Sequence, residues 1–324
     1  MKAIVYQRYG PPEVLQIRQV PDPIPGPKQI LVQVKAVEAT KADCELRSFN
    51  FPVKWFWLPL RLFWGIAKPR KGVLGGYFSG VVLQSPEKSD FSPGDEVFGS
   101  TGMGMGAYGA KVCIPVENNL VVKPQNMSFE EAAAVPLGGL NALHFLKKAK
   151  VQPGERVLVN GAGGSIGLFA VQIAKALGAE VTAVDAAHKE DMVLSIGADH
   201  FINYQQQDFT KLNQKYQVIF DMVAQSSYKG CVSRLEENGR YLIGNPRLGD
   251  MLKAGITSKF TDKEVFFAFA AEKKEELEEL KSLIEAGKIK SVIHKVLPME
   301  NVVNAHQLIE SEQRVGSVVL NINL

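Results

Sequence analysis

Residues 157–178 read Val-Leu-Val-Asn-Gly-Ala-Gly-Gly-Ser-Ile-Gly-Leu-Phe-Ala-Val-Gln-Ile-Ala-Lys-Ala-Leu-Gly. The stretch begins as a short β-branched run that ends at Asn160, passes through a glycine-rich turn, and continues as an apolar run with helical spacing. A strand that leads through such a turn into a helix is typical of the first half of a parallel βαβ unit. We therefore expect a parallel sheet with crossover helices in this half of the chain.

The turn has the small residues that a dinucleotide-binding turn needs. Ala162, Gly164 and Gly167 occupy the relative positions of the three small residues in the dinucleotide fingerprint. Small residues let backbone amides approach a pyrophosphate, and the N-terminus of the following helix adds a positive potential there. The predicted cofactor-binding turn comprises Gly161, Ala162, Gly163, Gly164, Ser165 and Ile166. A turn that serves only helix packing is the alternative.

An acidic residue follows at the position where this fingerprint expects one. Asp185 ends the next apolar run, about 20 residues after the turn, where a carboxylate accepts hydrogen bonds from the adenosine ribose hydroxyls. The carboxylate favours NAD because it repels the 2′-phosphate of NADP. His188 and Lys189 lie just beyond and either neutralise that phosphate or are ordinary surface residues. The choice between NADH and NADPH therefore stays open.

Strand-like and helix-like segments alternate from residue 156 to residue 243, which predicts a doubly wound α/β domain. Before residue 120 the sequence is rich in β-branched runs and turn signals, and predicts a β-rich domain. Ser128-Phe-Glu-Glu131 is a capping box that opens a helix. We expect residues 272–286 to form a charged helix on the parallel sheet, and the β-like segments 294–298 and 315–322 to return to the first domain.

Composition restricts the classes of partner and compartment. The 324 residues include 37 Lys or Arg and 34 Asp or Glu, and this small excess of positive charge argues against a nucleic-acid partner. The three cysteines form neither a disulfide framework nor the paired spacing of a structural zinc site, which suits a reducing compartment. Because no secretory signal is visible at the N-terminus, we expect a cytoplasmic protein.

Several further motifs occur in an order that resembles the medium-chain dehydrogenase/reductase superfamily, in particular its zinc-free quinone oxidoreductase branch. The resemblance spans nearly the whole chain and rests on 1–6, 9–15, 93–98, 132–136, 139–142, 161–167, 197–199 and 316–320. It implies a GroES-like β-rich substrate domain formed by residues 1–122 and 291–324, and a Rossmann domain with a doubly wound parallel sheet at 123–290. It also implies a homodimer, with the strand-like residues 264–270 as the pairing edge.

Two substitutions at the metal positions of this superfamily favour a zinc-free enzyme. Zinc-dependent relatives use a Cys and a Gly-His-Glu motif, and this chain has Thr40 at the first position and Gly76-Tyr77 at the second. Neither replacement offers a soft nitrogen or a thiolate to zinc. Without a Lewis acid, oxidation of a simple alcohol is disfavoured, whereas hydride addition to a quinone or an α,β-unsaturated carbonyl needs only a few hydrogen-bond donors.

The resemblance also carries over individual residues. Thr40, Lys41 and Asp43 are candidates for the nicotinamide end, with Tyr77 or Tyr108 as proton donors. Alternatively, Asp43 only caps a helix, Tyr77 is a core aromatic residue and solvent delivers the proton. On the cofactor side, the implied residues are Asp185 with Lys189 at the ribose, Tyr204 near the adenine, Val223 and Gly244 at the nicotinamide, and Asn141 at the phosphates or the nicotinamide ribose.

The most unusual local feature is the aromatic segment 49–71, which contains all three tryptophans and ends in Lys68-Pro-Arg-Lys71. Its prolines, its cations and its short apolar runs argue against a membrane span. It is either a lid or wall for a bulky hydrophobic substrate near the cleft, part of the core, or an interfacial contact with a membrane or partner.

Three functions remain at this point. The first is a zinc-independent, NAD(P)H-dependent oxidoreductase for quinones, enones or similar conjugated carbonyls. The second is a 2-enoyl thioester reductase whose acyl channel would use the tryptophan segment as a wall. The third is a nucleotide-binding protein without catalysis, which uses the fold for partner or membrane contacts; the departures from family residues at Thr40, Tyr77 and Asn141 keep it open.

Overall fold

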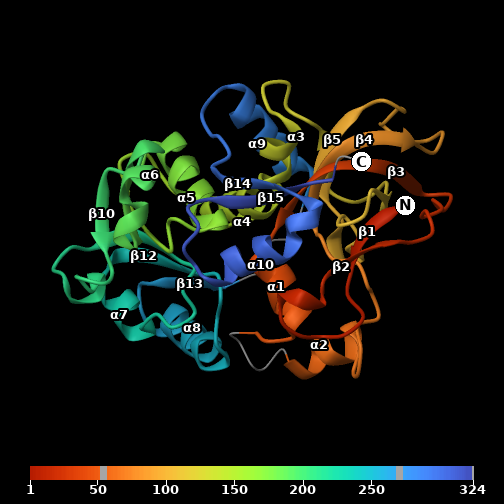
Figure 1. Ribbon diagram of the computed structural model, residues 1–324. Coiled ribbons are helices and arrows are strands. Elements are labelled where there is room, and N and C mark those ends of the chain that lie inside the picture. The colour runs from red at the N-terminus through yellow and green to blue at the C-terminus, as the bar shows by residue number, and fades with distance from the viewer. Residues whose placement is uncertain (52–56, 268–272, 323–324) are drawn as a thin grey trace. The chain divides into compact units, whose positions relative to one another are not determined.

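The computed structural model describes residues 1–51, 57–267 and 273–322. Backbone contacts divide the chain into two compact units (Figure 1). The first unit contains Met1–Leu137, Glu272–Glu285 and Ser291–Leu324, and the second contains Gly138–Ala271 and Ala286–Lys290. In the described residues, no helix combines the length and the apolar character that crossing a membrane requires.

The second unit contains a six-stranded parallel sheet, which confirms the predicted doubly wound fold. Its strands stand in the order β10-β9-β8-β11-β12-β13. The chain therefore starts in the middle of the sheet, moves to one edge, and then returns to build the other half. The strands are β8 (Arg156–Asn160), β9 (Glu180–Asp185), β10 (His200–Asn203), β11 (Tyr216–Asp221), β12 (Leu235–Ile243) and β13 (Glu264–Phe267).

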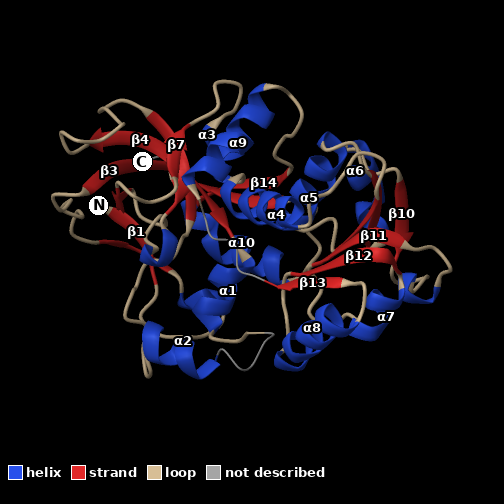
Figure 2. Ribbon diagram, turned by 180° about the vertical axis from the view of Figure 1, so that it is seen from behind, coloured by secondary structure: helices blue, strands red, loops and turns tan. Residues whose placement is uncertain are grey.

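Helices cover both faces of this sheet, as crossover connections in a doubly wound fold require. Figure 2 shows α4, α5 and α6 on one face and α7 and α8 on the other. A Cβ atom at Gly138 would lie 2.3 Å from the Ser165 carbonyl oxygen, so the glycine allows α4 to approach the start of α5. The helices are α4 (Pro136–Lys148), α5 (Ser165–Ala176), α6 (Glu190–Ser195), α7 (Tyr228–Ser233) and α8 (Leu248–Phe260), with 3₁₀ turns η4 (Ala187–Lys189) and η5 (Phe209–Lys211).

The first unit contains a seven-stranded sheet and a separate antiparallel pair, β1 (Lys2–Val5) and β2 (Gln16–Gln19). The sheet follows the order β14-β15-β3-β4-β5-β7, and β6 also pairs with β3. Because β15 lies antiparallel to β3, with Val318 opposite Ala39, the predicted return of the tail to the first domain is confirmed. The strands are β3 (Gln29–Ala39), β4 (Tyr77–Gln84), β5 (Glu96–Ser100), β6 (Lys111–Pro115), β7 (Leu120–Val122), β14 (Ile293–Pro298) and β15 (Ser317–Asn321).

Helices and 3₁₀ turns lie between the strands of this unit along the chain. The predicted capping box is present, because the Glu131 amide donates to Ser128 Oγ at 3.2 Å and the Ser128 amide donates to Glu131 Oε2 at 2.8 Å. It opens a helix of only five residues, α3, and a new helix starts at Pro136. The remaining elements are α1 (Lys41–Ser48), α2 (Trp57–Trp64), α3 (Phe129–Ala133), α9 (Lys274–Glu285) and α10 (Val302–Glu310), with 3₁₀ turns η1 (Pro12–Val14), η3 (Gly102–Gly104) and η6 (Met299–Asn301).

The charged helix α9 differs from its predicted place. Its apolar face, Leu277, Leu280 and Ile284, is buried as expected, but the helix packs against β7 of the first unit and not on the parallel sheet. Asn126 donates to the Ile284 carbonyl oxygen at 2.9 Å, and Lys274 pairs with Asp90 at 2.8 Å. Helical periodicity identifies the face that is buried but not the surface that covers it.

The boundaries of the two units also differ from the predicted domain boundaries. Residues 123–137 and α9 belong to the first unit, whereas the sequence assigned 123–290 to the parallel-sheet domain. Contacts of α3 with β3, β4 and β15 account for part of this difference. The boundaries 1–122 with 291–324, and 123–290, remain a prediction about domains.

Candidate functional site

The glycine-rich turn adopts a tight conformation between β8 and α5. Gly161 has φ +85°, in the left-handed region that favours glycine. The Gly161 amide donates to the Val184 carbonyl oxygen at 3.0 Å, which joins the turn to the neighbouring strand β9. A Cβ atom at Gly167 would lie 2.2 Å from the Gly161 carbonyl oxygen, so only glycine allows the helix to pass this close to the turn.

Helix α5 begins without a side-chain cap, unlike α1 and α3. Thr40 and Asp43 form a capping box at α1, and Ser128 and Glu131 form one at α3, whereas the N-cap of α5 is Gly164 and offers no side chain. The amides of a first helical turn attract an anion when no side chain of the protein caps them. The turn therefore fits the pyrophosphate of a dinucleotide, as the fingerprint predicts.

The carboxylate of Asp185 faces this turn and carries a counter-ion. It accepts hydrogen bonds from the Gly163 amide at 2.7 Å and from the Ala186 amide at 2.8 Å. Lys189 Nζ lies 2.9 Å from Asp185 Oδ1, and both side chains are largely buried. A Cβ atom at Gly163 would lie 2.3 Å from Lys189 Cδ, so this glycine makes room for the pair. His188, the other cation considered at this position, is exposed.

Tyr204 lies beside Asp185 because β10 runs parallel to β9. Asn203 is the register partner of Asp185, and the Tyr204 amide donates to the Asp185 carbonyl oxygen at 3.2 Å. The Tyr204 side chain is 57% exposed and is available to a ligand. The structure thus brings Asp185, Lys189 and Tyr204 together at the carboxyl ends of two neighbouring strands.

Val223 and Gly244 follow the carboxyl ends of the neighbouring strands β11 and β12. The Val223 amide donates to Asp221 Oδ1 at 3.0 Å, and the Gly244 amide donates to the Asp221 carbonyl oxygen at 2.8 Å. One edge of the parallel sheet therefore contains the glycine turn, Asp185, Tyr204, Val223 and Gly244. Its strand order reverses between β8 and β11, where ligands of such sheets bind. The remaining cofactor candidate, Asn141, is half-buried on α4.

Asp221 is a residue of this edge that the sequence analysis missed. Its carboxylate is buried and accepts from Asn160 Nδ2 at 2.9 Å, Ser226 Oγ at 2.9 Å and the Tyr241 hydroxyl at 2.7 Å, in addition to the Val223 amide. Burial raises the pKa of this carboxyl, and its hydrogen bonds counteract the shift. An acid that ends an apolar strand was the available signal. Asp221 fixes the loop that presents Val223.

In the first unit, the structure brings Thr40 and Asp43 together in a capping box. The Thr40 hydroxyl donates to Asp43 Oδ2 at 2.6 Å, and the Asp43 amide donates to Thr40 Oγ1 at 3.0 Å. The Gly75 amide donates to Asp43 Oδ1 at 3.1 Å, which ties α1 to the segment before Tyr77. Both side chains are buried, and burial raises the pKa of Asp43. A structural role as a helix cap, one of the two alternatives for Asp43, is thus present.

Lys41 and Tyr77 lie in different surroundings from this buried pair. Lys41 Nζ is exposed and pairs with Glu312 at 2.7 Å. Tyr77, the first residue of β4, is half-buried, which distinguishes it from a fully buried core aromatic residue. Its role as a proton donor remains a prediction.

Tyr108, the other proposed proton donor, is fully buried in a chain of polar groups. Its hydroxyl lies 3.0 Å from His306 Nε2, and His306 Nδ1 lies 3.3 Å from Cys44 Sγ. Burial raises the pKa of Tyr108 well above its usual value and lowers the pKa of His306 to about 3. A hydroxyl in this position has no access to a substrate in this conformation.

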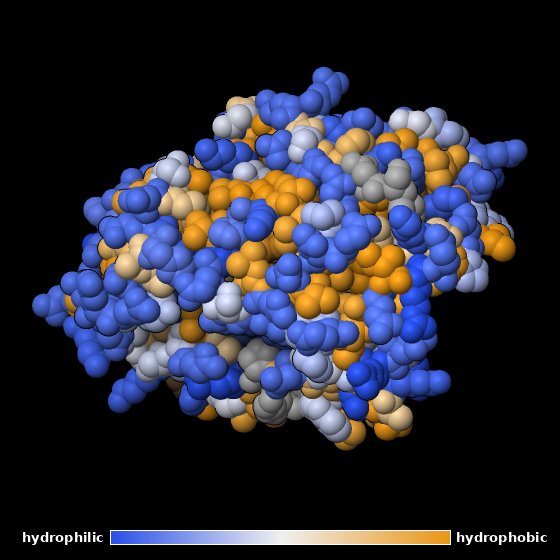
Figure 3. All heavy atoms as spheres, in the orientation of Figure 1, coloured by the Kyte–Doolittle hydropathy of each residue, from blue (hydrophilic) through white to orange (hydrophobic). Residues whose placement is uncertain are grey.

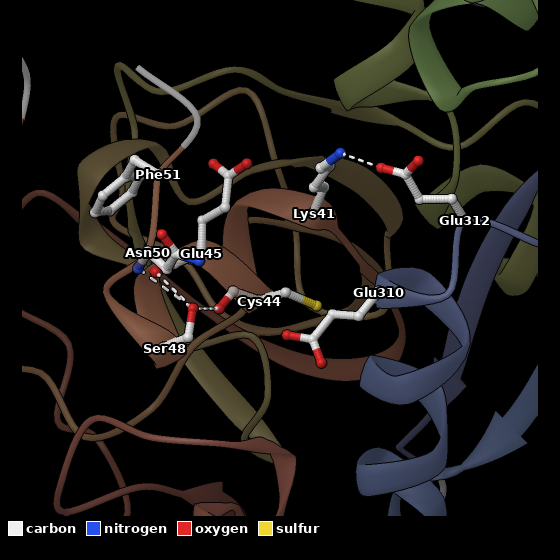
Figure 4. Close-up of a pocket in the computed structure, with 8 residues that line it drawn as sticks. All are labelled: Lys41, Cys44, Glu45, Ser48, Asn50, Phe51, Glu310 and Glu312. Carbon is white, nitrogen blue, oxygen red and sulfur yellow. Dashed lines mark hydrogen bonds and ion pairs between the residues drawn. The ribbon is translucent and has the colours of Figure 1, made fainter. Parts of the chain in front are cut away.

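A pocket of about 280 Å³ opens beside α1 (Figure 4). Figure 4 shows the Lys41–Glu312 pair on one side of the pocket and the Cys44 sulfur pointing toward the Glu310 side chain. Burial raises the pKa of Glu45 to about 7, an effect that the nearby charge of Lys41 reduces. Glu45 was not among the residues predicted from the sequence. The residues that line the pocket are Lys41, Cys44, Glu45, Ser48, Asn50, Phe51, Glu310 and Glu312.

The described residues contain no cluster of three or more His, Cys, Asp or Glu side chains arranged to hold a metal ion. Cys44, Cys113 and Cys231 are free thiols, and Cys44 and Cys231 are buried.

Comparison with known proteins relates the chain to oxidoreductases. Residues 196–320 match the model of a family described as zinc-binding dehydrogenase. The chain is 29% identical to 2-methylene-furan-3-one reductase of Solanum lycopersicum, over 99% of the chain and 79% of the relative. It is 29% identical to quinone oxidoreductase 1 of Escherichia coli, over 98% of both chains. The solved quinone oxidoreductase of Coxiella burnetii superposes with a TM-score of 0.88 at 26% identity, covering 100% of this chain and 99% of that chain.

Proposed function

We propose that this chain, a quinone oxidoreductase-like member of the medium-chain dehydrogenase/reductase superfamily, is an NAD(P)H-dependent oxidoreductase that reduces quinones, enones or similar α,β-unsaturated carbonyls. The observation that carries the proposal is the glycine turn at the start of α5, which has no side-chain cap and lies where the strand order reverses. The names of the relatives from tomato and Escherichia coli support the same substrate class.

The cofactor residues have distinct tasks in this proposal. The turn from Gly161 to Ile166 holds the pyrophosphate, Asp185 and Lys189 lie at the adenosine ribose, and Tyr204 lies near the adenine. Val223 and Gly244 contact the nicotinamide by their backbone, and Asn141 reaches the phosphates or the nicotinamide ribose. When bound, NAD(P)H supplies a hydride. Asp221 acts as a positioning residue, because its carboxylate holds the Val223 amide.

The Asp185–Lys189 pair bears on the choice between NADH and NADPH. A lone carboxylate at this position would repel a 2′-phosphate, but here Lys189 neutralises it at 2.9 Å. The Asp185 carboxylate also accepts hydrogen bonds from the Gly163 and Ala186 amides, so fewer of its lone pairs can accept from the ribose hydroxyls. We infer that the wild-type protein discriminates weakly between the two cofactors.

The reaction consumes one hydride and one proton. For an enone, the hydride adds to the β-carbon, the C=C π electrons move toward the carbonyl oxygen as an enolate, and a proton then adds to the α-carbon. A quinone takes up a hydride and a proton to give the hydroquinone. We propose Thr40, Lys41 and Asp43 as the residues that shape the nicotinamide end and Tyr77 as the proton donor, with solvent as the alternative. Thr40 and Asp43 would act by positioning, since their polar groups bond each other.

We propose that this chemistry needs no zinc. The metal-ligand positions of the superfamily are occupied here by Thr40 and by Gly76-Tyr77, which supply neither imidazole nor thiolate. We also propose a cytoplasmic homodimer that pairs through residues 264–270. Of these, Glu264–Phe267 form β13, an edge of the parallel sheet, and 268–270 lie outside the described residues. Light scattering coupled to size exclusion tests the dimer.

The function is tested by following the oxidation of NADH and NADPH at 340 nm with a panel of quinones and enones. Turnover that a zinc chelator leaves unchanged is expected. Inhibition by the chelator with recovery on added zinc would refute zinc independence, and tight cofactor binding without turnover over the whole panel would favour a non-catalytic nucleotide-binding protein.

A matched pair of variants tests the cofactor turn itself. In Gly163→Val the branched side chain meets Lys189 and Asp185, so cofactor affinity should fall at least tenfold. Gly255→Ala adds a methyl group where no atom lies within 4 Å and should bind as wild type. Equal affinities in the two variants would remove the glycine turn from the proposal.

A further inference from the structure

The helix α2 presents apolar side chains to solvent, in the reverse of the usual amphipathic arrangement. Leu58 is 60% exposed, Leu62 53%, Phe63 49%, and Ile66, just after the helix, 63%. Leu58 and Leu62 are four residues apart and share a face of the helix. These four residues form what we call the α2 surface.

The opposite side of the helix is fixed to the first unit. Trp64 is buried in the core, and the Tyr9 hydroxyl donates to the Gly65 carbonyl oxygen at 2.9 Å. The guanidinium of Arg61, the one charged residue of the helix, lies over the rings of Tyr9 at 4.2 Å and Phe49 at 4.3 Å. Because the cation and Trp64 anchor the inner side, the orientation that exposes the leucines is set by several contacts.

Positive charge directly follows the α2 surface in the sequence. Residues 57–86 contain four cations, Arg61, Lys68, Arg70 and Lys71, and no Asp or Glu, although the whole chain is nearly neutral. Lys68 and Arg70 are exposed, and Lys71 Nζ bonds the carbonyl oxygens of Met103 at 2.7 Å and Gly104 at 3.0 Å. In Figure 3, hydrophobic and strongly hydrophilic atoms lie next to each other where Figure 1 places α2.

We propose that the α2 surface is a peripheral docking site for a membrane that contains anionic phospholipids. Exposed Leu and Phe side chains bind the boundary between headgroups and acyl chains, and neighbouring Lys and Arg bind anionic headgroups. A nucleic acid would use the cations but would leave Leu58, Leu62 and Ile66 in water. The helix is too short to span a bilayer, so it lies in the interface. This inference does not depend on the proposed reductase activity.

Vesicle co-sedimentation of the full chain tests this inference. Vesicles of phosphatidylcholine alone are compared with vesicles that contain about 30% phosphatidylglycerol, in low and high salt. We expect at least tenfold tighter binding to the anionic vesicles and a weakening by salt. All three tryptophans lie within residues 55–64, so a blue shift of their emission on binding would report this segment directly.

Variants separate the α2 surface from general stickiness. Leu62→Ser with Phe63→Ser, and separately Lys68→Glu with Arg70→Glu, should each reduce vesicle binding at least fivefold. The control for the apolar variant is Leu252→Ser with Ile256→Ser on α8, where the side chains are 73% and 60% exposed. The control for the charge variant is Lys215→Glu, at an exposed lysine. These controls should bind vesicles as wild type.

Three results would overturn the inference: no binding to anionic vesicles, equal binding to neutral and anionic vesicles, or an equal loss in the α8 control. Binding of heparin or polyglutamate that competes with vesicles and is lost in the charge variant alone would indicate a polyanionic partner instead. Melting temperatures and cofactor affinities that match wild type show that each variant is folded.

Discussion

Substituting Asp185 by serine should shift the cofactor preference toward NADPH. In the wild-type structure the carboxylate pairs with Lys189 at 2.9 Å and accepts the Gly163 amide at 2.7 Å. Serine removes the negative charge and leaves the Lys189 ammonium without its counter-ion beside the expected position of the adenosine ribose. That cation is then available to a 2′-phosphate, which only NADPH carries.

The magnitude follows from Coulomb's law. Two unit charges about 4 Å apart attract by about 1 kcal/mol in water and by about 4 kcal/mol at an effective dielectric constant of about 20. The Lys189 side chain is 12% exposed, so the pair belongs between these limits. A gain of roughly 1.4 to 2.7 kcal/mol corresponds to a 10-fold to 100-fold increase in the ratio of NADPH to NADH affinity. Loss of the acceptor for the Gly163 amide weakens both cofactors alike and cancels from the ratio.

Fluorescence titration of both reduced cofactors measures this ratio. The titrations compare five proteins, each in low and in high salt: wild type, Asp185→Ser, Asp185→Asn, Lys189→Ala and the Asp185→Ser/Lys189→Ala double variant. The asparagine variant keeps the shape of the side chain and should shift in the same direction. A ratio that stays within about twofold of wild type in Asp185→Ser would refute the electrostatic role of Asp185. An equal shift in the double variant would refute the role of Lys189.

Three further outcomes are expected. His306 has a pKa of about 3 in the folded protein and about 6.5 in the unfolded chain, so its contribution to stability is present above pH 6.5 and is lost as the pH falls toward 3. The free energy of unfolding in urea should therefore be about 2 kcal/mol lower at pH 5 than at pH 8. His306→Gln should lack this pH dependence. Burial raises the pKa of Glu45 from 4.5 to about 7, so its charged form lowers the folding stability fully above pH 7 and less and less toward pH 4.5. Glu45→Gln should therefore raise the melting temperature more at pH 8.5 than at pH 5. An equal rise at both pH values would contradict the pKa shift. Gly167→Ala places a Cβ atom 2.2 Å from the Gly161 carbonyl oxygen and should lower cofactor affinity at least tenfold in the same fluorescence titration, whereas unchanged binding would show that the turn adapts.

Local patterns account for the parts of the fold that the sequence predicted. The alternation of strands and helices after residue 156 and the capping box at Ser128 depend on neighbouring residues, and both are present. The pairing of β15 with β3 joins residues about 280 positions apart. Only the β-like character of the tail and the family resemblance pointed to that pairing, because no local rule selects a distant strand partner. The same limit explains why α9 was assigned to the wrong surface.

The cofactor edge was more predictable than the substrate side for the same reason. The prediction that the turn binds phosphate depends on spacing within one βα unit, which the sequence displays directly. The counter-ion of Asp185 was visible as a nearby Lys, but its bond to the Gly163 amide required the turn and β9 to meet. Asp221 gave only a weak signal, since an acid at the end of a strand has many roles.

Residues that look reactive in the sequence become structural when a fold buries them together. Tyr108, His306 and Cys44 come from three distant parts of the chain and contact one another in the interior of the first unit, where His306 lies between the other two. An unpaired polar group at such depth is costly, so removal of one member should destabilise the others, and the group specifies how α1 and α10 pack. Burial raises the pKa of Tyr108 and lowers that of His306, which keeps both neutral near pH 7 and makes proton exchange with a substrate unfavourable. Of the two tyrosines predicted as proton donors, the half-buried Tyr77 is therefore the better candidate, with solvent as the alternative source of the proton.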